Sequence, residues 1–315
     1  MTTTMNRLPV STWNPLGVNC APASAALPTV PADGWAKAEI LSPALPAGVT
    51  APAEADFTDF AASGMGAEAD AWLAENANLV NHLAVTGTAD APVVFETALD
   101  ADHPHALTCL TIDAAEGSSL TVVQVVRGDA EDGVSANLTR IRAAEGAHVV
   151  LVQVQLLGSH ARRWNAVSIE QGKSARVEQV RIELGGAVVA CGTRTLLNHN
   201  KCEYDLDAVY FGHGSDVLDF NDVSVHTGKD TLCEMHTAGV LTGHADKILR
   251  GTVDFQRGAK RGVGHESEDV LLFSPNARNR TPPSSSAVRR RSRASTLPAW
   301  AALTRTSCII CAPAG

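Results

Sequence analysis

Five side chains of metal-ligating type stand close together in the sequence: His226, Cys233, Glu234, His236 and His244. Thiolate, imidazole and carboxylate groups are ligands that iron and zinc take from proteins. On a β-strand Glu234 and His236 share one face and Cys233 points to the other, because successive side chains alternate. The spacing matches no closed metal site, which favours a buried core cysteine beside solvated histidines. Cys233, His236 and His226 are therefore the candidates for cofactor binding, and no metal ligand set is assigned.

Other catalytic motifs do not appear in the sequence. Gly228-Lys229 is followed by Asp230 where a phosphate-binding P-loop needs Ser or Thr. No G-x-S-x-G nucleophile elbow is present. Cys191 and Cys202 are expected to be core residues, since a cysteine without a reactive environment behaves as a small apolar side chain. The chain is therefore not itself a P-loop ATPase, and no catalytic residue is assigned.

The composition narrows the class of protein. The chain has 315 residues, 45% of them hydrophobic, with 25 basic and 34 acidic residues and a formal net charge of −9. An acidic chain is a poor candidate for nucleic-acid binding, which needs a basic face. Neither a transmembrane helix nor a signal peptide is recognisable. Seven widely spread cysteines do not form the pattern of a secreted disulfide framework. We expect a cytoplasmic protein that binds neither nucleic acid nor a membrane.

Residues 82–280 are predicted to form β-strands. Apolar and polar residues alternate in short runs, for example Leu120–Val126, His148–Leu157, Ala175–Leu184 and Asp216–Val225. We interpret Val and Ile as the buried face of each strand and the polar residues as its solvent face. Gly117, Gly146, Gly172 and Gly214 open several of these runs, and Asp132-Gly133 is the only short hairpin signal. This pattern favours a β-solenoid over a two-sheet sandwich.

The two ends of the chain differ from this core. Residues 1–81 are rich in Ala and Pro, and the apolar spacing from Gly66 to Asn81 predicts one amphipathic helix. Residues 281–315 contain five arginines and no acidic residue, so residues 1–280 carry a net charge of −14. The sequence predicts an irregular N-terminal segment (1–81), a β-core (82–280) and a basic, disordered tail (281–315).

A family resemblance is visible near the end of the core. Arg250–Ala259 reads R-G-T-V-D-F-Q-R-G-A and Glu268–Ser274 reads E-D-V-L-L-F-S. These segments resemble the SufB/SufD family of iron–sulfur cluster assembly proteins, and the opening Ser11–Asn19 is similar to SufD-type members. The matching motif residues are Gly251, Asp254, Phe255, Ala259, Asp269, Leu271 and Leu272.

The resemblance implies a right-handed parallel β-helix and a role as a non-catalytic scaffold subunit. Its implied partners are a SufC-like ATPase and a SufB-like subunit, or a second copy of itself. It implies no stably bound cofactor, with a transient iron–sulfur cluster at a partner interface. A β-helix carbohydrate-active enzyme, using Asp205, Asp207, Asp216, Asp219 and Asp222, and a stand-alone binding solenoid are the alternatives.

The tail departs from the family pattern, which continues with an apolar strand and an acidic helix. Codons can be chosen for Thr281–Gly315 that, read one base back, spell an ending containing G-R-L-D-E-D-K-L-Y-Y-L, as the family has it. We therefore expect the tail to be translated out of frame and assembly with a SufC-like partner to be impaired. Sequencing the codons for Asn279–Gly315 tests this expectation.

Overall fold

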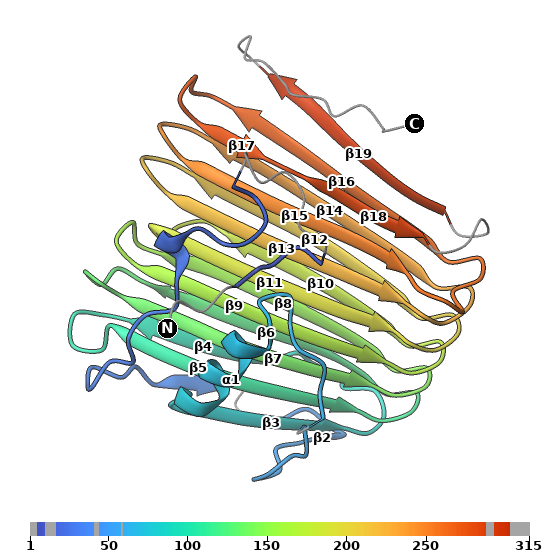
Figure 1. Ribbon diagram of the computed structural model, residues 1–315. Coiled ribbons are helices and arrows are strands. Elements are labelled where there is room, and N and C mark those ends of the chain that lie inside the picture. Colours follow the sequence, from blue (N-terminus) through green and yellow to red (C-terminus); the bar gives the residue numbers. More distant parts are fainter. Residues whose placement is uncertain (1–4, 10–16, 41–43, 58, 288–292, 303–315) are drawn as a thin grey trace, which may run out of the picture.

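The protein is a parallel β-solenoid of about seven turns, in which two sheets face each other (Figure 1). The computed structural model describes residues 5–9, 17–40, 44–57, 59–287 and 293–302. The coils follow one another along the solenoid in sequence order, from the first coils to the C-terminal ones (Figure 1). The expected solenoid is confirmed, and the sandwich alternative is not.

Sheet A contains β2 (Val49–Thr50), β3 (Leu79–Val85), β5 (His105–Ala114), β7 (Val134–Ala143), β9 (Arg162–Gln171), β11 (Val188–Leu197), β13 (Val217–His226), β15 (Asp246–Phe255) and β17 (Arg278–Arg280), with β18 (Pro283–Ala287) also paired to β15. Sheet B contains β1 (Ala38–Ile40), β4 (Val93–Leu99), β6 (Ser119–Gly128), β8 (His148–Leu157), β10 (Arg176–Glu183), β12 (Glu203–Gly212), β14 (Leu232–Leu241), β16 (Val263–Leu272) and β19 (Arg293–Ala302). The chain alternates between the sheets, so each strand pairs with the next strand but one.

Each coil places its side chains directly above those of the preceding coil. Val217 of β13 pairs with Asp246 of β15, 29 residues later, and the pairing is parallel and in register along the whole strand. Corners between the sheets need backbone angles that favour glycine, and Gly117 and Gly146 have φ of 65° and 67°. Rows of side chains therefore run along the solenoid, and each coil contributes one residue to each row.

The N-terminal segment covers the outer face of sheet A. Its single α-helix, α1 (Ala67–Asn76), contacts β5 and β7, and a short 3-10 turn (Ala23–Ala25) contacts β11 and β13. The expected helix is therefore confirmed but shorter than Gly66–Asn81. Ala77 is extended, and Leu79 and Val80 belong to β3, because pairing with β5 satisfies their backbone groups.

The predicted alternation is correct in β8 and β10, but the buried face is apolar at the start of each strand, at Val149 and Val177, and contains polar residues further along it. In β10 Gln179, Arg181 and Glu183 point into the solenoid and are buried, whereas Val180 and Ile182 are half-buried on the outer face. Gln153 and Gln155 of β8 likewise point inward. The polar side chains occupy the interior because they find partners on neighbouring coils there.

The interior is apolar at both corners and polar between them. One apolar cluster contains Leu151, Val167, Tyr204, Cys233 and Phe255, and another contains Val189, Cys191, Tyr210 and Leu249. A polar zone lies between these clusters and runs through successive coils. This zone is the most unusual chemical feature of the fold, because apolar side chains normally fill a buried interior.

Two short stretches of the tail have strand geometry. β18 pairs with β15 over Gly251–Phe255, and β19 pairs with β16 over Val263–Leu272. Over these stretches the structure differs from the expectation of a disordered tail, because the last coil offers unpaired backbone groups at its edge. Residues 288–292 and 303–315 lie outside the described residues, and the reading-frame hypothesis stays a prediction.

Candidate functional site

A network of buried amides forms the first part of the polar zone. Asn137 Nδ2 donates to Asn165 Oδ1 at 2.8 Å, and Gln153 Nε2 donates to the same oxygen at 3.1 Å and to Gln124 Oε1 at 2.8 Å. Gln179 Nε2 then donates to Gln153 Oε1 at 3.0 Å. The network thus connects several successive coils through side chains alone, and we call it the polar column.

A buried ion pair continues the polar column. Arg181 on β10 donates to both carboxylate oxygens of Asp222 on β13 at 2.8 Å, and the two side chains are 1% and 4% exposed. Burial opposes the charge on Arg181, but the Asp222 carboxylate outweighs it and raises the pKa of Arg181. A bidentate contact of this kind fixes the relative position of both partners.

Three further charged residues lie at the C-terminal end of the polar column. Lys247 on β15 donates to Glu268 on β16, which also accepts from Tyr210 at 3.3 Å. Glu266, two residues before Glu268, lies opposite the motif residue Gly251, and a Cβ on Gly251 would overlap its carboxyl group. Gly251 is therefore required here for space, and its missing side chain makes room for a buried acid.

Glu266 gives a pH-dependent prediction. Burial, Asp222 and Glu268 raise its pKa from 4.5 to about 8, against the opposing effect of Lys247. The folded protein therefore binds a proton that the unfolded chain releases at pH 6.5–8, and the free energy of unfolding falls as pH rises, by at most about 1.4 kcal/mol per pH unit from this group. In urea unfolding across this range, Glu266→Gln should show a smaller fall than wild type.

A competing titration acts in the opposite direction at the acid end of this range. Burial lowers the pKa of His226 from 6.5 to about 4, so the unfolded chain binds more protons there than the folded one, and this group makes the free energy of unfolding rise with pH. Its contribution fades above pH 6.5 as the unfolded histidine also loses its proton, and it is the same in wild type and Glu266→Gln. Equal slopes in wild type and Glu266→Gln would contradict a protonated Glu266.

The buried cysteines hold their thiol protons. Burial raises the pKa of Cys191 well above 9, that of Cys202 to about 11 and that of Cys233 to about 12. Cys191 Sγ lies 3.4 Å from Glu183 Oε1, whose own pKa is also raised by burial. Because the thiolate is the form that binds metals and attacks electrophiles, these groups are unreactive in this conformation.

The structure does not bring the predicted candidate ligands together. His226 and Cys233 point into the solenoid, where the His226 ring packs on Phe255 and its Nδ1 lies 2.8 Å from Thr231 Oγ1. His236 points out from sheet B and lies 3.1 Å from Asp269 and 3.7 Å from Asp207. His244 is exposed at the opposite corner and contacts Asn276. Within the described residues no three His, Cys, Asp or Glu side chains are arranged to hold a metal ion.

The aspartates of the carbohydrate-enzyme alternative are also separated. Asp205 and Asp207 lie on the outer face of sheet B, and Asp216 lies at a corner, where it accepts from the His213 N–H. Asp222 is inside the solenoid, and Asp219 is buried under the N-terminal segment against Arg250. A glycosidase needs two carboxyl groups facing one bond, and these five do not share a surface.

The remaining motif residues surround the last complete coil. Phe255 and Ala259 are buried in the interior, and Leu272 packs against an interior apolar cluster. The other three motif residues lie on outer faces: Asp254, Asp269 and Leu271. Of the opening motif, Gly17–Asn19 is described and Ser11–Leu16 lies outside the described residues. The motif thus combines core packing with the space that Glu266 needs.

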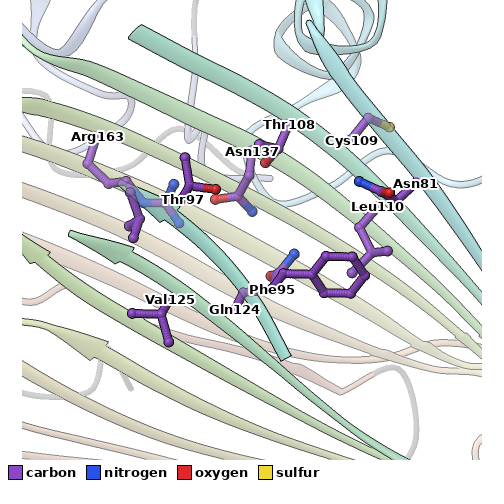
Figure 2. A pocket seen from close by; sticks show the side chains of 11 residues that line it. Asn81, Phe95, Thr97, Thr108, Cys109, Leu110, Gln124, Val125, Asn137 and Arg163 are labelled. Carbon is purple, nitrogen blue, oxygen red and sulfur yellow. The ribbon is translucent and has the colours of Figure 1, made fainter. Parts of the chain in front are cut away.

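A small cavity lies in the first coils, at the start of the polar column. Its volume is about 40 Å³, and its lining includes Thr97, Gln124, Asn137 and Arg163 (Figure 2). Arg163 is 5% exposed, and its NH1 donates to Ser135 Oγ at 2.9 Å. The cavity has room for a small ligand.

Sequence reasoning missed Arg163, Arg181, Glu183, Lys247, Glu266 and Glu268 as functional candidates. In β10 three polar residues stand at every second position. Within one strand such a row cannot be distinguished from a solvent-exposed face. Comparing strands shows the signal, since Gln153 and Arg181 occupy paired positions on neighbouring coils. A row of polar residues that persists across coils indicates a buried column as readily as a solvated edge.

Comparison with known proteins supports one family. Within the described residues no helix is long and apolar enough to cross a membrane. A search of curated proteins finds no match to the chain. A family model described as SUF system FeS cluster assembly, SufBD core domain, matches residues 97–294, which include β5 to β16. The match covers more than half of the chain, and the chain therefore belongs to the SufBD core family, whose members take part in iron–sulfur cluster assembly.

Proposed function

We propose that this chain is a SufD-like scaffold subunit of the SUF complex. In this role it pairs with a SufB-like subunit, or with a second copy of itself. It acts together with a SufC-like ATPase and does not itself catalyse a reaction. The observation that carries the proposal is the family match over residues 97–294. The opening Ser11–Asn19 and the short N-terminal part support the SufD-like assignment, whereas the motif residues around Gly251 support the SufB/SufD family as a whole.

The interior chemistry is compatible with a scaffold. The polar column contains paired amides and the Arg181–Asp222 ion pair, and the buried thiols are protonated. An iron–sulfur cluster, as the cargo of assembly, would therefore be held transiently at a partner interface rather than inside the solenoid. Such a cluster would need thiolate or imidazole ligands from the surface or from the partner.

Co-purification tests the proposal and separates it from the condition of the tail. The chain is co-expressed with a tagged SufB-like subunit and a SufC-like ATPase, beside a variant whose residues 281–315 are replaced by the shifted-frame ending. We expect the variant to recover both partners and the chain with its own tail to recover less of the ATPase. Full recovery of the ATPase by the original chain would contradict the impairment, and failure of both chains to bind either partner would contradict the scaffold role.

A further inference from the structure

The guanidinium of Arg163 is a buried positive charge without an ion-pair partner. No carboxylate of the described residues lies within 4 Å of it, and its Nε has no hydrogen-bond partner. Arg181, which also points into the interior from the next strand β10, is instead paired with Asp222. Because arginine keeps its proton in proteins, a buried and unpaired guanidinium is costly unless something else supplies negative charge.

The cavity beside Arg163 has a lining that suits an anion. Arg163 reaches toward Thr97 and Asn137, with Gln124 on the other side of the space (Figure 2). The lining contains one cation, three amide side chains and two threonine hydroxyls, and no carboxylate. Amide N–H groups, hydroxyls and a guanidinium all donate hydrogen bonds, which is how proteins hold anions.

The acid that acts on Arg163 does not pair with it. The Glu183 carboxylate favours the charged form of Arg163, but the two form no ion pair, and Oε2 of Glu183 has no hydrogen-bond partner. Burial raises the pKa of Glu183, which disfavours its charged form. Among the described residues, no carboxylate therefore contacts the Arg163 guanidinium directly.

From the cavity and the unpartnered guanidinium we infer that the solenoid binds a small monovalent anion, of halide size, beside Arg163 Nε. The volume of about 40 Å³ compares with roughly 10–15 Å³ needed for one water by the same kind of measure. One small anion therefore fits, with space for a water that donates to Asn137 Oδ1, which has no partner in the structure. Water alone would satisfy the hydrogen bonds but bring no negative charge into contact with the guanidinium.

Anion binding would stabilise the first coils of the folded protein. The lining comes from β3, β4, β5, β6, β7 and β9, so an ion there contacts both sheets over successive coils. A ligand that binds only the folded state raises stability in proportion to the logarithm of its concentration. The inference is independent of the proposed scaffold function, since it concerns folding of this chain alone.

Bromide is the probe, because its anomalous scattering identifies it. Crystals of the full chain soaked in sodium bromide should show an anomalous peak in the cavity, in contact with Arg163 Nε. In solution, bromide should raise the melting temperature of wild type by a few degrees relative to methanesulfonate at equal ionic strength, and the rise should saturate. Methanesulfonate is the comparison because it carries the same charge and is larger than bromide.

Arg163→Gln should remove the bromide effect on melting, and Arg162→Gln is its matched control. Arg162 is the adjacent residue of β9 but lies on the outer face, where its NH2 donates to Ser24 O at 3.2 Å. Arg162→Gln should keep the wild-type response. If Arg163→Gln does not fold, the anomalous map of wild type decides. A map with water in the cavity, peaks only at the surface (an adventitious ion only), or equal bromide responses in wild type and Arg163→Gln would overturn the inference.

Discussion

Replacing Asp222 with alanine is expected to lower the free energy of unfolding by about 3–5 kcal/mol, because it leaves the Arg181 guanidinium buried without its partner. Arg181 is 1% exposed, so water cannot replace the lost carboxylate. The loss is a large fraction of the roughly 5–15 kcal/mol that stabilises a typical domain. Urea unfolding followed by circular dichroism at pH 7 measures it.

Asp207→Ala is the control for this prediction. Asp207 is on the outer face of sheet B, its side chain is 71% exposed, and it lies 3.7 Å from His236. Its removal should cost less than about 1 kcal/mol, as exposed ion pairs do. Replacing both partners, as Arg181→Met with Asp222→Leu, should recover much of the lost stability. If Asp222→Ala is as mild as Asp207→Ala, the ion pair does not hold the coils together.

Arg250→Ala is expected to release the N-terminal segment from sheet A. Arg250 donates from NH1 and NH2 to the two carboxylate oxygens of Asp219 at 2.9 Å, and also to the backbone carbonyls of Val18 and Cys20. Its loss leaves Asp219 buried with only the Asn6 amide, which donates to it at 2.6 Å. We expect a loss of about 3–5 kcal/mol. Hydrogen exchange should accelerate at the amides of Leu8 and Ala21, which bond within this segment.

Arg261→Ala provides the comparison for the Arg250 result. Arg261 also forms an ion pair with an aspartate, Asp230, but the two side chains are 64% and 37% exposed. Its removal should change stability by less than about 1 kcal/mol and leave exchange at Leu8 and Ala21 unchanged. Equal exchange in Arg250→Ala and wild type would show that apolar packing alone holds the segment.

The strands of the solenoid could be predicted from the sequence, but the inner face of some of them could not. His148–Leu157 is predicted and observed with the same bounds, because alternation marks a strand directly. The buried face depends on which partners the other coils supply. The partner of Arg181 is Asp222, 41 residues away, so no window around β10 contains the information.

The candidate site was predictable only in part for the same reason. Alternation alone places Cys233 and His236 on opposite faces of β14, and the structure has them so. His226 points inward from β13 of sheet A, whereas His236 points outward from β14 of sheet B, and the sequence of β13 alone does not reveal which of its faces points inward. The end of α1 was missed because pairing of Leu79 with Thr108, a tertiary contact, overrides the helical spacing.

The charges inside the solenoid also act against misfolding by coil slippage. If the interior were entirely apolar, coils of nearly equal length would stack almost as well with one sheet displaced by a full coil relative to the other. Such a displacement would set Arg181 opposite Thr193 or Gly251 instead of Asp222, since these three occupy one row of sheet A. The misaligned chain would then bury an unpaired charge, at a cost of several kcal/mol. The Arg181–Asp222 ion pair thus specifies the register of the coils, because only one stacking brings the two side chains together.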